Sequence, residues 1–202
     1  MKIISFNVNS IRSRLHQLAA VIDKHQPEII ALQETKVQDL EFPSAAIQDL
    51  GYCASYYGQK THYGVALLSR SAPVDVQYGF ATDKEDDQRR LIAATYALDK
   101  GKSLRVINGY FPQGESRDHP LKFPNKRRFY SELLAQLKGQ ENPEELLLVV
   151  GDMNVASGDN DPPIILYDFA HYVQTPCMSE DVDYTRDSGL VYGDQSISPA
   201  TK

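Results

Sequence analysis

Three apolar stretches of this 202-residue sequence each end in side chains that carry hard oxygen donors. Asn7 ends the first stretch and Glu34 follows the second. Asp152 and Asn154 follow the third, and Tyr110 ends a further apolar run. Magnesium prefers oxygen ligands, keeps several waters and needs only one or two carboxylates. At a phosphodiester such an ion neutralises developing charge, helps to generate hydroxide and stabilises the leaving oxygen. The Tyr110 hydroxyl can donate a hydrogen bond to a phosphate oxygen.

Each of these residues also has an ordinary structural interpretation. Asn and Asp at strand ends commonly form turns or cap helices. A single Glu is commonly a solvated charge, and a single Tyr commonly packs half-buried against the core. Spacing alone therefore leaves two interpretations open, a metal site and a set of structural side chains.

Hydrophobic periodicity predicts the elements that would position these side chains. Residues 2–8 alternate apolar and polar like a short strand. A helix is predicted next, with Ser10 as its cap and Leu15, Leu18 and Ile22 on one face. Further strands are predicted at 29–32, 52–57, 63–69, 74–78, 91–98, 104–110 and 146–150.

Turn and helix signals complete this pattern. Residues 99–102 form a plausible hairpin turn between two strands. One short helix is predicted at 43–50, stopped by Gly51, and a longer one begins near Pro124 and ends at Gly139. Strands that alternate with helices indicate an α/β protein, in which sites are assembled at strand ends from distant segments. We therefore predict that Asn7, Glu34 and Asp152 converge on one pocket at the tips of adjacent strands.

The composition is ordinary for a globular protein, with 42% hydrophobic and 24% charged residues, and it argues against disorder throughout. No apolar run approaches the length of a bilayer span, and the N-terminus does not resemble a secretory signal. Cys53 and Cys177 provide neither a metal-ligand spacing nor a disulfide framework. We therefore expect a cytoplasmic protein with no membrane partner.

The net charge of −6 at first argues against a nucleic-acid partner. Residues 155–202 carry eight acidic and two basic side chains, so the whole excess of negative charge lies in that segment. Residues 1–154 are neutral and can still present a local basic face to DNA.

Five motifs occur in the order and at the intervals of the bacterial exonuclease III (apurinic/apyrimidinic endonuclease) family. They are SFNVNSIRSR, LQETKV, GQKTHYGVALLS, NGYFPQGESRDHPLKFP and GDMN. The sequence therefore resembles that family over residues 1–156. The resemblance implies a four-layer α/β sandwich, in which two packed β-sheets are flanked by helices. It also implies a monomeric enzyme that uses Mg²⁺, or Mn²⁺ in its place. Such an enzyme removes nucleotides from 3′ ends of duplex DNA and nicks DNA on the 5′ side of abasic sites.

The resemblance also implies a role for each candidate residue. Glu34 is a metal ligand, and Asn7 supports the metal or the phosphate. Tyr110 contacts the scissile phosphate. Asp152 activates or orients the attacking water, and Asn154 helps to hold the phosphate.

Lys36 and Arg90 lie near the DNA-facing rim in the same comparison. Ordinary solvated surface charge is an equally good interpretation of these two residues.

The sequence departs from the family after GDMN. The family continues with an R-I-D strand segment and a near-terminal S-D-H-x-P, and neither occurs here. His171 lacks the flanking acid and proline, and His119 belongs to the family's mid-chain loop. We therefore predict an incomplete sandwich over residues 1–156 and a poorly ordered segment unlike the family over 157–202. A frameshift and a genuine replacement both remain as origins of that segment.

Three functional hypotheses follow. The first is an active magnesium-dependent DNA nuclease, and the second is an inactive family member that retains metal or DNA binding at most. The third is a phosphoesterase acting on small molecules or lipids. The NGYFPQG loop counts against the third, and the missing Asp-His pair favours the second over the first.

Overall fold

The computed structural model describes residues 1–139, 145–155 and 171–172. Its first sheet has four strands in the order β1-β2-β4-β3. β1 and β2 are parallel, and the other two pairings are antiparallel. The bounds are Ile3–Asn7 for β1, Ile29–Gln33 for β2, Cys53–Tyr57 for β3 and Val65–Ser69 for β4.

The second sheet has five strands in the order β5-β6-β7-β8-β9. β7 and β8 are parallel, and the remaining neighbours are antiparallel. The bounds are Asp75–Tyr78 for β5, Leu91–Ala97 for β6, Ser103–Tyr110 for β7, Glu145–Asp152 for β8 and His171–Tyr172 for β9. The chain therefore completes one sheet before it begins the other.

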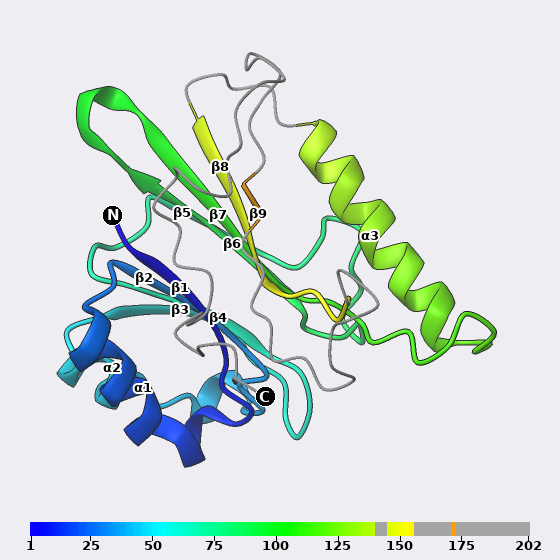
Figure 1. The fold of residues 1–202 in the computed structure, drawn as a ribbon, viewed down its shortest axis with the longest axis horizontal. Helices are drawn as coiled ribbons and strands as arrows, with labels where there is room; N and C mark the ends of the chain where they lie inside the picture. The colour runs from blue at the N-terminus through cyan, green and yellow to red at the C-terminus, as the bar shows by residue number, and fades with distance from the viewer. Residues whose placement is uncertain (140–144, 156–170, 173–202) are drawn as a thin grey trace, which may run out of the picture.

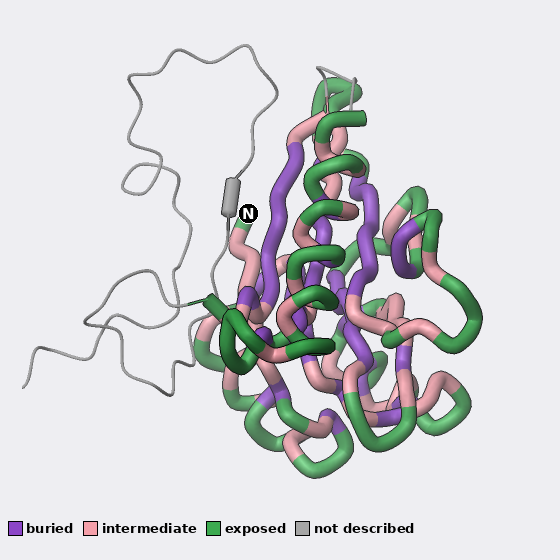
Figure 2. Tube along the Cα trace, turned by 90° about the vertical axis from the view of Figure 1, so that its right-hand side faces the viewer, coloured by how far each residue is buried: buried purple, intermediate pink, exposed green. Residues whose placement is uncertain are grey.

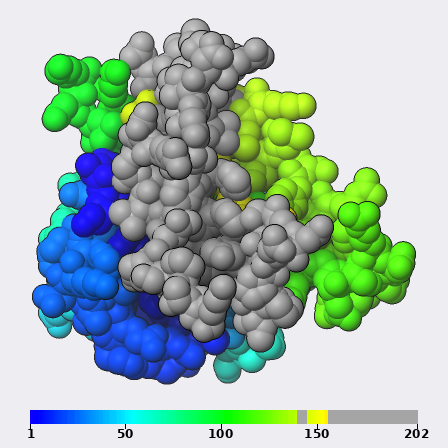
Figure 3. Space-filling model, in the orientation of Figure 1, coloured from blue at the N-terminus to red at the C-terminus, as the bar shows by residue number. Residues whose placement is uncertain are grey.

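Helices cover the outer face of each sheet (Figure 1). Helices α1 (Ile11–His25) and α2 (Ser44–Asp49) lie on the first sheet, and α3 (Lys122–Lys138) lies on the second. In the space-filling view the N-terminal helices and α3 occupy opposite sides of the molecule (Figure 3). Two short 3₁₀ turns, η1 (Asp39–Glu41) and η2 (Asp99–Gly101), lie in connections.

Three apolar layers hold these four layers of secondary structure together. One lies between α1, α2 and the first sheet, one between the two sheets, and one between the second sheet and α3. Every residue of β2 is buried because both of its faces are covered, and in Figure 2 the buried segments run through the middle of the described part. This arrangement confirms the predicted α/β sandwich of two sheets flanked by helices.

Most predicted elements are present with slightly different ends. The turn at 99–102 does join two antiparallel strands, and the helices do end before Gly51 and at Gly139. The predicted cap at Ser10 is wrong: Ser10 has φ 84° and no side-chain cap hydrogen bond. Its backbone N–H instead donates to the Glu34 carbonyl oxygen at 2.7 Å, so the chain there is shaped by the loop after β2.

The predicted poorly ordered segment, residues 157–202, lies outside the described residues except for β9. The predicted boundary at residue 156 therefore stays a prediction. No described helix is long and apolar enough to cross a membrane.

Candidate active site

The layer between the two sheets changes from apolar to polar toward one end. Alternate residues of a strand share one face, and each strand here begins that face with apolar residues of the inter-sheet core. Moving along the chain, the same face ends in amide, phenol or acid side chains. The four series are Ile3, Ser5, Asn7 in β1; Ile29, Ala31, Gln33 in β2; Val106, Asn108, Tyr110 in β7; and Leu148, Val150, Asp152 in β8.

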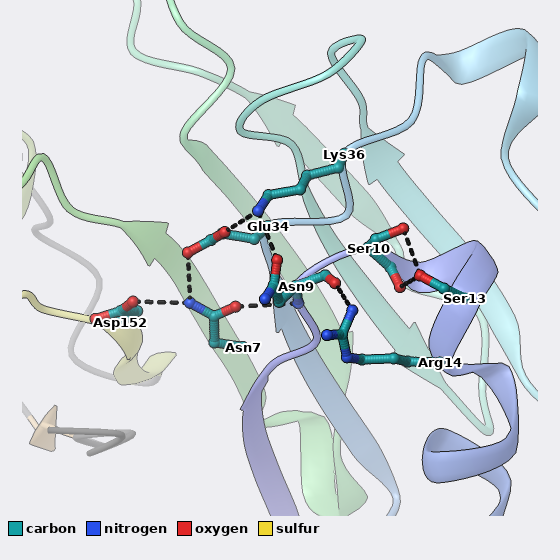
Figure 4. Close-up of polar contacts among 8 residues, drawn as sticks. All are labelled: Asn7, Asn9, Ser10, Ser13, Arg14, Glu34, Lys36 and Asp152. Atoms are coloured by element: carbon teal, nitrogen blue, oxygen red, sulfur yellow. Dashed lines mark hydrogen bonds and ion pairs between the residues drawn. The ribbon is translucent and has the colours of Figure 1, made fainter. Parts of the chain in front are cut away.

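The amide of Asn7 joins two carboxylates at this end. Its Nδ2 group donates to Glu34 Oε1 and to Asp152 Oδ2, each at 2.9 Å (Figure 4). The predicted convergence of Asn7, Glu34 and Asp152 is therefore confirmed. We expected the three residues at the tips of adjacent strands. Asn7 ends β1 and Glu34 follows its neighbour β2, as expected, but Asp152 ends β8 of the second sheet. The site thus spans both sheets.

Lys36 neutralises part of this acidic pair. Its Nζ atom lies 2.7 Å from Glu34 Oε2 and donates to Asn9 Oδ1. Burial alone would raise the pKa of Glu34, but polar contacts with Asn7, Lys36 and Tyr110 outweigh it, and the pKa lies below its usual value. Glu34 is therefore held as a carboxylate, and Lys36, predicted at the DNA-facing rim, is paired with it.

Asp152 is in a different electrostatic setting from Glu34. Burial raises its pKa, and the neighbouring Glu34 charge adds to that effect, whereas hydrogen bonds from Asn7 and the Asn154 N–H oppose it. The Asn154 N–H donates to Asp152 Oδ1 at 3.1 Å. A carboxylate with a raised pKa is better suited to accept a proton than an ordinary surface aspartate.

Asn154 is held by the polypeptide on two sides. Its Nδ2 group donates to the Phe111 carbonyl at 2.8 Å, and its own carbonyl accepts from Lys126 Nζ at 2.6 Å. These contacts fix the loop that follows β8. The predicted phosphate contact of Asn154 stays a prediction.

The Arg90 guanidinium lies against the rings of two tyrosines. Its guanidinium carbon lies 4.2 Å from the Tyr63 ring centroid and 4.7 Å from that of Tyr110. Burial lowers the pKa of Arg90, and the surrounding groups partly offset this. Burial also raises the pKa of Tyr110, with Glu34 adding to the rise. Tyr110 therefore keeps its proton at physiological pH and remains a hydrogen-bond donor.

Left-handed backbone gathers around the site. Of the described residues other than glycine with φ between 43° and 62°, five lie at or next to the site: Asn9, Glu34, Lys36, Tyr63 and Asn154. Such conformations cost energy and persist where the surroundings impose them, commonly at functional sites. The loops after β2 and β8 are thus bent to present their side chains.

The donor set fits a small, hard divalent cation. An oxygen of Glu34 and one of Asp152 lie within hydrogen-bond distance of a common point, the Asn7 nitrogen. Asn7 Oδ1 accepts from the Asn9 N–H at 3.1 Å, and this contact orients the amide with its nitrogen toward both acids. In the part of the chain that the structure describes, no three His, Cys, Asp or Glu side chains are arranged to share a metal ion. Magnesium does not require three acids.

Sequence reasoning missed four residues of this arrangement. Asn9, Tyr63 and Lys126 carry no signal in an isolated sequence that separates them from surface residues. Asn108 had one: it is an amide within an apolar strand, and a buried amide needs a partner.

A sequence profile of the Endonuclease/Exonuclease/phosphatase family matches residues 4–195. The chain belongs to this family. One relative is exodeoxyribonuclease III of Haemophilus influenzae, which is 50% identical to this chain over 161 residues. The aligned residues cover 80% of this chain and 60% of that protein. The resemblance to exonuclease III stated from the five motifs is thereby confirmed.

Solved structures agree with this family assignment. A 3′-5′ exonuclease from Neisseria meningitidis superposes with a TM-score of 0.70 at 40% identity, covering 79% of this chain and 60% of that one. An AP endonuclease from Archaeoglobus fulgidus gives 0.68 at 38% identity, with 77% and 58% covered. The chain thus spans about 60% of the length of these relatives.

The contacts of Arg90 with two tyrosines lead to a first prediction. We expect Arg90→Lys to lower the free energy of unfolding by about 1–2 kcal/mol, because a compact ammonium cannot lie against the Tyr63 and Tyr110 rings together as the planar guanidinium does. Urea denaturation measures this. Arg12→Lys is the control, since Arg12 forms an exposed ion pair with Glu41, and its effect should stay within about 0.5 kcal/mol. Equal effects of the two substitutions would show that the contacts of Arg90 with the two tyrosine rings do not stabilise the fold.

Proposed function

We propose that this site hydrolyses phosphodiester bonds of duplex DNA with magnesium as cofactor, by removing nucleotides from 3′ ends and by nicking 5′ to abasic sites. The observation that carries the proposal is the Asn7 bridge between Glu34 and Asp152. It brings two carboxylates with different electrostatic settings to one point, beside a protonated phenol and a partly buried guanidinium.

Each residue of the site has its own role in this proposal. Glu34, with Asn7 as its orienting partner, holds the ion, which supplies charge neutralisation at the phosphate and activation of water. Asp152 accepts the proton of the attacking water, because burial has raised its pKa. Tyr110 donates a hydrogen bond to a phosphate oxygen.

Arg90 and Asn154 complete the proposed phosphate contacts. Arg90 places a positive charge beside Tyr110, and such a fixed charge stabilises negative charge that develops on the phosphate. Asn154, held by Phe111 and Lys126, contributes a further polar group at the same end of the sheets. Lys36 lowers the pKa of Glu34 and so helps to keep it ionised.

A second candidate function is binding of metal or DNA without efficient turnover. It is favoured by the sequence after residue 154, which contains no Asp-His pair followed by a proline two positions on. His119 does not replace that pair, because its Nδ1 atom accepts the backbone N–H groups of Leu121 and Lys122 before α3.

The test is cleavage of a duplex that contains one abasic-site analogue, by the purified 202-residue polypeptide. We expect nicking 5′ to the analogue with Mg²⁺, no nicking with EDTA, and turnover roughly 100- to 1,000-fold below that of the Haemophilus influenzae relative. Cleavage that persists in EDTA would contradict the proposed chemistry. Magnesium-dependent duplex binding without nicking would establish the second candidate instead.

A further inference from the structure

Two buried amides join the sheets directly behind the candidate site. Gln33 is the last residue of β2 and Asn108 lies in β7, and both are fully buried. Gln33 Nε2 donates to Asn108 Oδ1 at 2.7 Å. This hydrogen bond crosses the layer between the two sheets, where the neighbouring residues are apolar.

The backbone of the first sheet holds both amides in place. Asn108 Nδ2 donates to the carbonyls of Leu32 in β2 and Ala66 in β4, each at 2.9 Å. Gln33 Nε2 also donates to the Ala31 carbonyl at 3.2 Å and to Ser5 Oγ in β1 at 3.1 Å. Asn108 of the second sheet is thus bonded to β2 and β4 of the first, and Gln33 links this network to β1 through Ser5.

This network is not an efficient source of stability. Among the described residues Gln33 Oε1 is buried without a hydrogen-bond partner. An unsatisfied buried polar group is costly, whereas two apolar residues of similar shape in place of a bonded pair can be neutral or stabilising. The amides therefore have a role other than packing.

Their position in the chain indicates that role. Gln33 immediately precedes Glu34 and is paired in register with Asn7. Asn108 is two residues before Tyr110 and is paired with Val150, two residues before Asp152. Glu34 and Asp152 are carried by different sheets, and Asn7 Nδ2 donates to each of them at 2.9 Å. A small slide of one sheet over the other breaks one of these contacts, because hydrogen bonds weaken steeply beyond about 3.5 Å.

We propose that Gln33 and Asn108 are positioning residues that fix the offset between the two sheets, so that Glu34 and Asp152 face one metal ion. The inference rests on the proposed function, since it assumes that this ion is bound. Neither amide needs to touch the ion or the DNA. Supporting groups of this kind, which orient ligands without being ligands, commonly change metal affinity by about 10- to 100-fold when they are removed.

The first test replaces one amide and uses a matched substitution elsewhere. Gln33→Met keeps the length of the side chain, removes the inter-sheet hydrogen bond and leaves Asn108 bonded to both carbonyls. Gln77→Met is the control, because Gln77 lies in β5 and bonds to Arg105 and the Gly79 carbonyl. Isothermal titration of the metal-free polypeptide with Mg²⁺ should show affinity about 10- to 100-fold weaker for Gln33→Met. Gln77→Met should match the wild type.

The second test separates positioning from stability. The double variant Gln33→Leu/Asn108→Leu removes the unpartnered Gln33 Oε1 and fills the layer with apolar side chains. The Leu32 and Ala66 carbonyls lose the Asn108 donor but remain within the β2–β4 ladder, so the variant's thermal unfolding midpoint should stay close to that of the wild type. Its Mg²⁺ affinity should nevertheless remain reduced. Ser5→Ala, which removes only a hydroxyl acceptor of Gln33, should give a smaller loss and serves if the amide variants do not fold.

The outcomes distinguish this inference from the proposed function. Wild-type Mg²⁺ affinity in the folded amide variants, or in Ser5→Ala if they do not fold, overturns the positioning role and leaves the proposed function intact. A wild-type polypeptide that does not bind Mg²⁺ overturns the proposed function, and the positioning role falls with it.

Discussion

Glu34→Gln should weaken Mg²⁺ binding by at least about 100-fold, more than loss of a supporting group costs. Glutamine has the same shape as glutamate but carries no charge, so the ion loses a ligand and Lys36 loses its ion-pair partner. Any Mg²⁺-dependent nicking should fall by roughly 100- to 1,000-fold, as when one electrostatic group is removed from an active site. Titration calorimetry and the abasic-duplex assay measure the two effects.

Glu41→Gln is the matched control for this substitution. Glu41 also forms an ion pair, with Arg12, but that pair is exposed and lies outside the acidic pair joined by Asn7. We expect unchanged Mg²⁺ affinity and nicking for this variant. If Glu34→Gln behaves like Glu41→Gln in both assays while the wild type binds Mg²⁺, then the ion is held elsewhere and the site assignment fails.

Gly151→Ala should lower the free energy of unfolding by about 3 kcal/mol or more, through strain and steric overlap together. Gly151 has φ 140°, which side chains rarely adopt, and a Cβ atom there would overlap the carbonyl of Gly109 on β7. The two glycines are paired in register in the parallel β7–β8 ladder. The backbone must move to accommodate the methyl group, and Asp152 moves with it. Denaturation followed by circular dichroism measures the loss.

Gly101→Ala separates strain from close approach. Gly101 has φ 73° in the turn between β6 and β7, and nothing lies within 4 Å of a Cβ atom added there. Its substitution should cost about 1 kcal/mol, from the backbone conformation alone. Gly151→Ala should also weaken Mg²⁺ binding, whereas Gly101→Ala should leave it unchanged. Similar losses of stability at the two positions would mean that the strands are farther apart than described.

The sequence was sufficient for most of the elements and for the three residues whose side chains are joined at the site. Each strand that precedes a candidate side chain carries a clear apolar run. Such a run predicts both that the segment is a strand and that it is buried in the core. The end of the run therefore identifies Asn7, Glu34 and Asp152 without any knowledge of pairing.

The sequence was not sufficient for the pairing of strands and sheets. Period-two alternation assigns a residue to a face but does not say which strand lies opposite that face. Asn7 and Asp152 were therefore expected on neighbouring strands, although they meet across two sheets. Asn108 was missed for the same reason, because its partners in β2 and β4 are known only once the packing of the two sheets is known.

Two further differences have local causes. Ser10 resembles a helix cap in sequence, but its backbone is already bonded to the loop that carries Glu34. Lys36 resembles a solvated cation in sequence, but its side chain forms an ion pair with Glu34, two residues earlier in the chain. In both cases the left-handed turn after β2, with Glu34 at φ 53°, brings the groups together. Backbone conformations that are rare for a residue type cannot be inferred from its identity.

The hydrogen bond between Asn7 and Asp152 joins residues 145 positions apart in the chain. All four strands of the first sheet lie within residues 3–69, so that sheet can assemble early as the polypeptide leaves the ribosome. The acidic pair cannot form until β8 has also emerged and the second sheet has docked. Closing so long a loop is entropically unfavourable and slow. In a nascent chain of this protein, Glu34 is therefore synthesised long before its partner across the sheets, and the pair stays incomplete until translation has passed residue 152.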